Sequence, residues 1–294
     1  MITNRSECRN PLGFGSCIRK LTATQNHRHQ SKMKQMLKLK YAVAAAIVML
    51  SALTTHSKTT DMDKIDQIKQ AGYAIDTYTA PSGETVNLVF IKHGSIAVEA
   101  GGYLVYIDPV TMFGNDFSVL PKADMILVTH EHGDHFDTKA IDQLTDDQTR
   151  FITNARVSEM YGQGQTMQPG DSIDVDEGHF TLTAVPAYNI SPDHLQFHPK
   201  ERKDLGFVFD IGGLRIYVAG DTEDIPEMES LRDIDIAFLP VNQPYTMTPA
   251  QAIHAVEMIN PKIVYPYHYG QTDLNPLIDR FKDSEVEVKV RQLQ

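Results

Sequence analysis

The sequence predicts an α/β protein in which two packed β-sheets carry helices on their outer faces. Three observations lead to this fold class. Behind an N-terminal leader, the chain opens with a run of strands and then alternates strands with helical segments. Residues 58–294 contain no internal repeat, low-complexity tract or linker. We therefore expect one large domain at 58–294, an αββα sandwich, preceded by a leader at 1–57.

The leader has the three-part layout of a secretory signal. Three lysines between positions 34 and 40 precede the apolar run Tyr41–Leu53, and small polar residues follow that run. A bilayer-spanning helix needs about 20 apolar residues, so the run is too short for a permanent anchor. We expect cleavage and export to the periplasm or the medium. Residues before Met33 match neither signal nor domain, so we expect translation to begin at Met33 or Met36.

Charge and cysteine content exclude several function classes. Residues 1–57 hold nine Lys or Arg and one acid, so the net charge of −11 for the whole chain leaves −19 on residues 58–294. Proteins that follow a nucleic-acid backbone need a basic surface, so DNA and RNA are not expected partners. Cys8 and Cys17 both precede the apolar run. The mature protein would therefore have no disulfide, catalytic thiolate, cysteine metal ligand or lipid-modified N-terminal cysteine.

Strands open the domain. Val86–Ile91 and Ser95–Ala100 are rich in β-branched and apolar residues, and a Gly101-Gly102 turn leads from them into Tyr103–Ile107. We expect these three strands to form an antiparallel meander. A short, wholly apolar strand is expected at Met125–Val128. The elements expected next are a helical segment near Asp137–Leu144 and strands at Phe151–Thr153 and Phe180–Val185.

The second half begins with a hairpin and then alternates strands with a helix. Gly206–Ile211 and Leu214–Ala219 flank a Gly212-Gly213 turn, and Ile234–Leu239 is typical of a buried strand. A helix is expected from Thr248, because this N-cap is followed by proline and by a glutamine at the capping-box position. Its apolar residues recur at helical spacing: Ala252, Ala255, Val256 and Ile259. The last expected strand is Ile263–Tyr267.

The sequence Thr129-His130-Glu131-His132-Gly133-Asp134-His135 stands directly after the apolar strand at 125–128. Positions two apart in an extended chain face the same way, so His130 and His132 can bind one ion. Gly133 permits a sharp turn, after which Asp134 and His135 can face a second ion. Imidazole and carboxylate ligands without a thiolate suit zinc first, with manganese or iron as alternatives.

This stretch resembles the signature of the metallo-β-lactamase superfamily, and the likeness extends through most of Val86–Gly270. His93-Gly94-Ser95 and Ile107-Asp108-Pro109 are similar to the family's opening segments. Ala219–Thr222 and Pro266–His268 resemble the segments that carry its later ligands. The resemblance implies the metallo-β-lactamase fold and two divalent ions: His130 and His132 on metal 1, Asp134, His135 and His268 on metal 2, and Asp221 between them.

The chain departs from the family at the third ligand of metal 1. The family usually supplies a histidine near the segment that is here Ala184–Asn189, and none stands in it. His194 and His198 follow closely, and we favour His198, delivered by a long polar loop at Asn189–Lys203 that folds back over the site. Tyr188 or water could take the place instead. His198 could also bind a substrate phosphate or carboxylate, or be an exposed loop residue.

Other residues near these motifs receive less direct roles. His93 and Asp108 are expected outside the ligand set, where Asp108 could accept the second ring N–H of a ligating histidine, or could merely end its strand. His179 and His254 are interpreted as surface residues. Tyr188 or Tyr245 could help to hold an oxyanion.

The resemblance and the ligand pattern together indicate a metal-dependent hydrolase. Two close divalent ions lower the pKa of a bridging water toward neutrality and polarise the scissile bond. Asp134 would orient that water and accept its proton. The expected substrate is an ester, lactone or phosphodiester in a small molecule or lipid; the sequence does not indicate the oligomeric state.

Three rival functions were considered. The first is a non-catalytic metal-binding or sensing protein of the same fold, and the second is a diiron flavoprotein-type reductase. That reductase would need a partner domain and an acidic ligand in the first motif, and the sequence has neither. A true β-lactamase is not expected either, because the cysteine ligand and the third histidine are absent.

Overall fold

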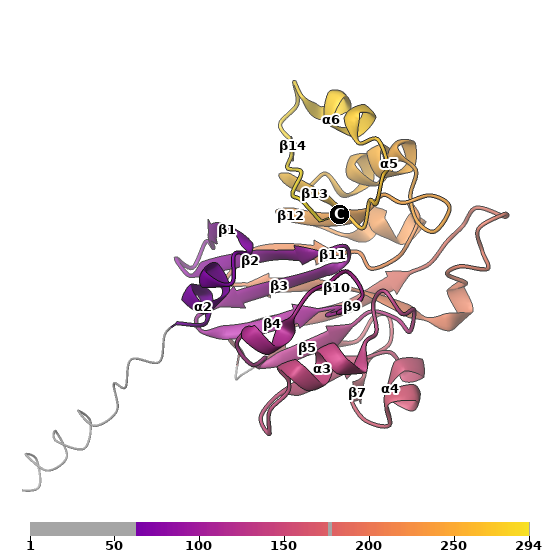
Figure 1. The fold of residues 1–294 in the computed structure, drawn as a ribbon. Helices are drawn as coiled ribbons and strands as arrows, with labels where there is room; N and C mark the ends of the chain where they lie inside the picture. The colour runs from indigo at the N-terminus through magenta and orange to yellow at the C-terminus, as the bar shows by residue number, and fades with distance from the viewer. Residues whose placement is uncertain (1–62, 176–177, 294) are drawn as a thin grey trace, which may run out of the picture. The chain divides into compact units, whose positions relative to one another are not determined.

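The computed structural model describes residues 63–175 and 178–293 (Figure 1). The expected leader, with its apolar run and the alternative starts at Met33 and Met36, lies outside these residues, so the secretory signal and the domain boundary at 57/58 stay predictions. Within the two described ranges, no helix is long and apolar enough to cross a membrane.

Two seven-stranded sheets form the domain, ordered β1-β2-β3-β4-β5-β6-β7 and β14-β13-β12-β11-β10-β9-β8. The first contains β1 Ala74–Thr79, β2 Thr85–Lys92, β3 Ser95–Ala100, β4 Tyr103–Ile107, β5 Met125–Val128, β6 Arg150–Thr153 and β7 Gln165–Thr166. The second contains β8 Ser172–Val175, β9 Phe180–Ala187, β10 Asp204–Ile211, β11 Leu214–Val218, β12 Ile236–Pro240, β13 Ile263–Tyr267 and β14 Glu287–Val288.

The two sheets share one plan, although the sequence shows no repeat. In each sheet the first four strands pair antiparallel, and the last three are added in parallel. The predicted meander of β2, β3 and β4 is confirmed, with Val98 opposite Leu88 and Val105. Loops that follow the parallel strands are free to carry polar side chains at a common edge, which is where α/β proteins place their sites.

The sheets pack face to face through a shared apolar core. Leu88 and Phe90 of β2 belong to that core, and the Phe90 ring lies 4.9 Å from the ring of Tyr265 in β13. Alternate residues of the same strand, Val89 and Ile91, face a second cluster that includes the helices at 64–70, 138–144 and 155–161. Both faces of β2 are therefore buried, at roughly 1.5–3 kcal/mol per large apolar side chain.

Helices cover the outer faces of the sheets (Figure 1). They are α2 Lys64–Gln70, α3 Thr138–Leu144, α4 Ala155–Tyr161, α5 Pro249–Ile259 and α6 Asn275–Phe281, with short 3-10 turns η1 Phe117–Val119, η3 Lys200–Arg202 and η4 Pro226–Ser230. The predicted capping box of α5 is present, because Thr248 and Gln251 each accept from the other's backbone. The four apolar residues expected on its inner face are buried.

The strands expected from sequence are found, with shifts of one or two residues at several ends. Ile234, expected at the start of a strand, lies two residues before β12. Seven helices and strands were not expected from the sequence: α2, β1, α4, β7, β8, α6 and β14. Several of these are short or half-exposed: β1 reads AIDTYT and lies at the edge of its sheet, so its pattern lacks the apolar alternation of a buried strand.

Candidate metal centre

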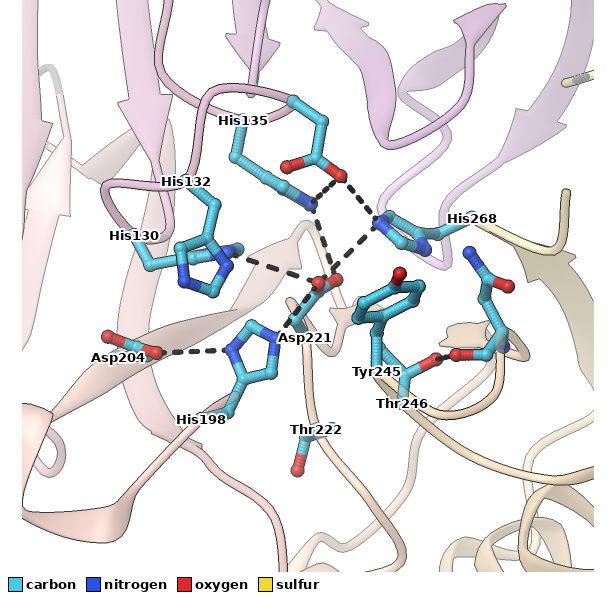
Figure 2. Close-up of polar contacts among 12 residues, drawn as sticks. His130, His132, His135, His198, Asp204, Asp221, Thr222, Tyr245, Thr246 and His268 are labelled. Atoms are coloured by element: carbon cyan, nitrogen blue, oxygen red, sulfur yellow. Dashed lines mark hydrogen bonds and ion pairs between the residues drawn. The ribbon is translucent and has the colours of Figure 1, made fainter. Parts of the chain in front are cut away.

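The predicted ligands gather where three strands end. His130 stands two residues after β5, Asp221 three residues after β11, and His268 directly after β13. The beginning of β10 joins this edge, because the backbone N–H of Leu205 donates to the carbonyl of Thr129 at 3.1 Å. Figure 2 shows the histidine rings converging on Asp221 from these separate segments.

One group of side chains consists of three histidines. A ring nitrogen from each of His130, His132 and His198 lies within 4.8 Å of those from the other two. The ring centroids are 4.6 Å apart for His130 and His132, 4.9 Å for His130 and His198, and 4.8 Å for His132 and His198. His198 thus lies beside the two motif histidines, with its ring buried, rather than pointing to solvent.

A second group contains Asp134, His135, His268 and His93. Oδ2 of Asp134 lies 3.2 Å from Nε2 of His268 and 3.1 Å from Nε2 of His93. His93 was expected outside the ligand set, yet its ring packs against that of His268 with centroids 3.8 Å apart. The structure therefore brings His93 as close to this group as the residues named from the motif.

Asp221 lies between the two groups. Its Oδ2 is 3.3 Å from Nε2 of His198, 3.9 Å from Nε2 of His130 and 3.5 Å from Nε2 of His268. Its Oδ1 is 3.4 Å from Nε2 of His135. One buried carboxylate thus faces histidines of both groups, as Figure 2 shows.

The donor atoms fit metal ions. Nε2 of His130, Nε2 of His135 and Oδ1 of Asp221 are buried and make no hydrogen bond. Buried polar atoms are normally hydrogen-bonded, and leaving one unpaired costs about 1–3 kcal/mol. Several such atoms that face a common centre are explained by a cation that they bind together. Imidazole nitrogen with carboxylate oxygen is a donor set for zinc, iron or manganese.

Carboxylates behind the histidines fix which ring nitrogen faces the centre. Nδ1 of His135 donates to Oδ2 of Asp108 at 2.7 Å, which leaves Nε2 free as a ligand atom. Asp108 is itself held by the N–H and hydroxyl of Thr129, both at 2.7 Å. Nδ1 of His198 lies 2.9 Å from Nη2 of Arg202 and 3.4 Å from Oδ2 of Asp204. Asp108 therefore occupies the outer position that the sequence suggests for it.

The pKa shifts differ among the histidines. Burial opposes protonation of His135 and His198, but Asp221, with Asp108 or Asp204, outweighs it and raises the pKa of both rings, so metal binding there must displace a proton. Burial, together with neighbouring His135, lowers the pKa of His130 well below its usual value, and burial, His198 and Arg202 lower that of His132 to about 4. Both imidazoles are therefore neutral, as ligands must be. Burial opposes ionisation of Asp221, but the facing histidines, His268 foremost, outweigh it and hold the pKa of this carboxyl well below its usual value.

Three residues around the centre have left-handed backbone conformations that non-glycine residues rarely adopt. These are His93 with φ 54°, Asp108 with φ 48° and His268 with φ 48°. Such a conformation costs about 1–3 kcal/mol and persists only where surrounding contacts enforce it. The backbone N–H of His268 donates to the carbonyl of His93 at 3.3 Å, and that of His93 donates to Leu293 at 2.7 Å. The C-terminal segment therefore helps to hold the site.

The loop at Asn189–Lys203 delivers His198. Oε2 of Glu223 accepts the backbone N–H groups of Ile190 and Ser191 at 2.7 and 2.6 Å, and its Oε1 faces Nδ1 of His194 at 3.1 Å. The N–H of Asn189 donates to the carbonyl of His198 at 2.8 Å, which closes the loop on itself. His194, the other candidate ligand, is therefore occupied by Glu223 and lies outside both groups.

Near the end of this loop, Arg202 is surrounded by site residues. Its Nε donates to both oxygens of Asp204 at 2.8 Å. Its Nη1 lies 3.0 Å from Nε2 of His132 and 3.4 Å from a carboxylate oxygen of Glu131. The guanidinium thus joins the His198 loop to the motif loop.

A pocket of about 380 Å³ opens onto the centre. Its lining residues are His93, His132, Asp134, Phe197, His198, Asp221, Asn242, Tyr245 and His268. Tyr245, one of the two candidate oxyanion donors, lies in this pocket (Figure 2). Tyr188 is not among the lining residues. Its hydroxyl donates instead to Glu227 at 2.7 Å. This contact argues against Tyr188 both as an oxyanion donor and as the missing ligand.

The remaining histidines lie elsewhere. His254 on α5 is more than half exposed and pairs with Asp224 at 2.7 Å, which agrees with its interpretation as a surface residue. His179 is half-buried, and its ring nitrogen lies 2.9 Å from the carbonyl of Ala100 in the β3–β4 turn.

Sequence reasoning missed Glu223, Asp204, Arg202, Phe197 and Asn242 as parts of the site. One weak signal existed: Glu223 stands two positions after Asp221 in the sequence. The structure shows both acids buried, which is rare for carboxylates without a partner.

Comparisons with known proteins agree with this geometry. A family model described as "Beta-lactamase superfamily domain" matches residues 103–269. A UPF0173 metal-dependent hydrolase of Thermus thermophilus is 33% identical over 195 residues, which cover 63% of this chain and 84% of that protein. One from Salinibacter ruber is 28% identical over 221 residues, or 70% and 96% of the two chains.

Solved structures give the same result. A Parabacteroides distasonis protein named as a metal-dependent hydrolase is 46% identical, with a TM-score of 0.73 over 76% of this chain and all of that one. The metallo hydrolase Igni18 of Ignicoccus hospitalis is 22% identical, with a TM-score of 0.57 over 70% and 95% of the chains, a likeness that concerns the fold alone.

Proposed function

Because this chain belongs to the β-lactamase superfamily and is a metal-dependent hydrolase, we propose that it uses two divalent ions, zinc in preference to manganese or iron, to cleave an ester, lactone or phosphodiester bond. The metallo-β-lactamase fold expected from the sequence is confirmed by these relatives and by the two-sheet architecture. The ion number, the metal and the bond are the proposed part.

The observation that carries the proposal is the position of Asp221. The three histidines on one side and the group around Asp134 on the other could each hold an ion, and Asp221 faces both. A shared carboxylate of this kind supports two ions close together. We assign His130, His132 and His198 to one ion, Asp134, His135 and His268 to the other, and Asp221 to both.

Divalent ions at such a site polarise a substrate oxygen, lower the pKa of water toward neutrality and stabilise the charge of the transition state. Asp134 is the proposed catalytic residue of the chain. Its side chain is 31% exposed and lines the pocket, so it can reach a substrate-side water. Burial raises the pKa of Asp134, but the contacts with His268 and His93 outweigh burial and lower the pKa overall. The carboxylate therefore stays ionised and can accept a proton from the attacking water.

Tyr245 and Asn242 line the same pocket and carry neutral hydrogen-bond donors. The backbone carbonyl of Tyr245 accepts from the side chain of Asn189 at 2.8 Å, which ties this segment to the His198 loop. A hydroxyl at the pocket wall can donate to the oxygen on which negative charge develops. We propose that Tyr245 has this role.

Metal analysis combined with a substrate panel tests the proposal. The purified, metal-loaded protein should hold close to two ions per chain and hydrolyse at least one class among p-nitrophenyl phosphodiesters, lactones and acyl esters. His132→Ala should lower both metal content and turnover. A folded protein that binds no ion when zinc is supplied would contradict the site. Two bound ions without turnover of any substrate class would favour the metal-binding or sensing alternative.

We also propose that the protein is exported and that its substrate is a small or lipid-like molecule rather than a nucleic acid. The lysines and apolar run at 34–53 and the charge of −19 on residues 58–294 support these points. Cell fractionation with N-terminal sequencing of the recovered protein tests export. Cytosolic protein that still carries Tyr41–Leu53 would contradict it.

A further inference from the structure

The pocket has two chemically different walls. One consists of the histidines and carboxylates of the metal centre, and the other contains the rings of Phe197 and Tyr245. These rings meet edge to face, with centroids 5.0 Å apart. Phe197 is partly exposed and Tyr245 is 46% exposed. An aromatic pair that is partly exposed at the pocket is positioned to contact a ligand there.

Other apolar side chains are exposed on the loops beside this pocket. Met112 is 62% exposed. Its methyl carbon lies 3.8 Å from the position that a Cβ atom on Gly133 of the motif loop would take. Ile190 and Leu195 are exposed on the loop that carries Phe197. Four of the seven large apolar residues exposed in the described ranges therefore belong to segments around one opening, which is how apolar ligand sites are distinguished from scattered surface residues.

Lysine and arginine side chains, by contrast, are absent from the described lining of the pocket. The neighbouring Arg202 is 13% exposed, and its nitrogens are taken up by Asp204, Glu131 and the two histidines beside it. Lys200 pairs with Glu227 at 2.8 Å. Phosphate oxygens that do not reach the two proposed ions are usually bound by Arg forks, Lys or helix N-termini, whereas an acyl carbonyl needs a single donor.

Resting on the proposed function, we propose that the substrate is an uncharged carboxylic ester or lactone whose apolar or aromatic acyl group lies against Phe197 and Tyr245. A volume of about 380 Å³ is near the lower end of the range for small-molecule sites, about 300–1,000 Å³, and suits one ring or a short chain. Water oxygen forms a bond to the carbonyl carbon, and the bond from that carbon to the alkoxy oxygen breaks. The alkoxy oxygen keeps the electron pair and takes a proton, so the products are a carboxylic acid and an alcohol.

Substrates that share one leaving group test this assignment. We expect the metal-loaded full-length protein to hydrolyse p-nitrophenyl phenylacetate and butyrate with kcat/KM about tenfold or more above p-nitrophenyl acetate, and all three above bis(p-nitrophenyl) phosphate. Phe197→Ala should reduce the preference for phenylacetate over acetate to within about threefold while acetate hydrolysis continues. Met160→Ala removes a similarly exposed apolar side chain from α4, away from the pocket, and should leave the preference unchanged.

A charge variant sharpens the test. Phe197→Lys places a cation at the apolar wall and should shift the ratio of phosphodiester to phenylacetate hydrolysis toward the phosphodiester by about tenfold or more. Faster hydrolysis of the phosphodiester than of every ester by the unmodified protein, unaffected by Phe197→Ala, would overturn the ester assignment and leave the proposed metal-dependent hydrolysis intact. Two bound ions without turnover of any of these compounds would overturn both.

Discussion

The two sources of the three-histidine group are built differently. His130 and His132 come from a short loop that directly follows β5, and this loop holds its own shape: the N–H groups of His135 and Phe136 both donate to the carbonyl of His132, at 2.9 and 2.8 Å. His198 comes from a long loop that is held from outside. Glu223 binds its beginning, and Asp204, which directly follows the loop, faces His198 and the loop's own Arg202.

This difference separates what local sequence specifies from what the fold must supply. In the motif loop, the ligand spacing and the backbone hydrogen bonds to His132 act locally, and Asp108 adds contacts to Thr129 and His135. In the loop at 189–203, the beginning of the loop is held by Glu223, a carboxylate 29 to 33 positions away from the residues that it contacts. We therefore expect His130 and His132 to keep their positions when Glu223 is changed, and the loop that carries His198 to be sensitive to that change.

The largest effect is expected where the two halves meet. Asp221→Ala removes the one side chain that faces both groups, so the protein should lose most of its metal and about a thousandfold or more in kcat/KM. Metal analysis and ester or phosphodiester kinetics measure this. Asp210→Ala, at the half-exposed β10–β11 hairpin, is the matched control. If the Asp221→Ala protein keeps two ions and its activity stays within about tenfold of the unmodified protein, Asp221 does not connect the two groups in the way proposed.

The next test compares ligands from the two halves directly. His198→Ala and His132→Ala should each lose about one ion per chain and about a hundredfold in activity, because both withdraw one imidazole from the same group. His254→Ala, at an exposed position on α5, should change neither quantity. If His198→Ala keeps two ions with full activity, water or another group supplies the third ligand.

A smaller effect is expected at the remote support of the His198 loop. Glu223→Ala leaves two backbone N–H groups and His194 without their partner, so metal affinity and activity should fall about ten- to a hundredfold. Hydrogen exchange at Ile190 and Ser191 should increase in the same variant. Glu223→Gln keeps an acceptor for the amides and should retain most activity. Unchanged exchange and metal affinity in Glu223→Ala would show that the loop holds itself.

The smallest effects separate two glycines of the site. Gly220 has φ +66°, and an added Cβ would lie 2.5 Å from the carbonyl oxygen of Leu205, so Gly220→Ala should reduce the free energy of unfolding by about 1–3 kcal/mol. Gly133 is not among the glycines with positive φ, and its added Cβ would meet only the Met112 methyl at 3.8 Å. Gly133→Ala should therefore change the stability by less than about 0.5 kcal/mol, measured by denaturant unfolding.

The sequence alone determined the strands that build the site and most of its candidate ligands. Apolar runs at 86–107, 125–128, 214–219 and 263–267 place polar residues at strand ends, and the H-x-H-x-D-H spacing brings four of them together. These features act over a few residues, through side-chain alternation and local turns, so they can be predicted before the fold is known.

Tertiary structure alone decided which other side chains lie at the centre. The sequence left His194, His198, Tyr188 and water as alternatives, and the choice follows from which loop contacts exist: Glu223 occupies His194, Glu227 occupies the Tyr188 hydroxyl, and His198 lies beside His130. The proximity of His93 to His268 and the aromatic wall of Phe197 and Tyr245 also join segments remote in sequence. Such contacts depend on how two sheets and their loops pack, and residue spacing along the chain does not encode that packing.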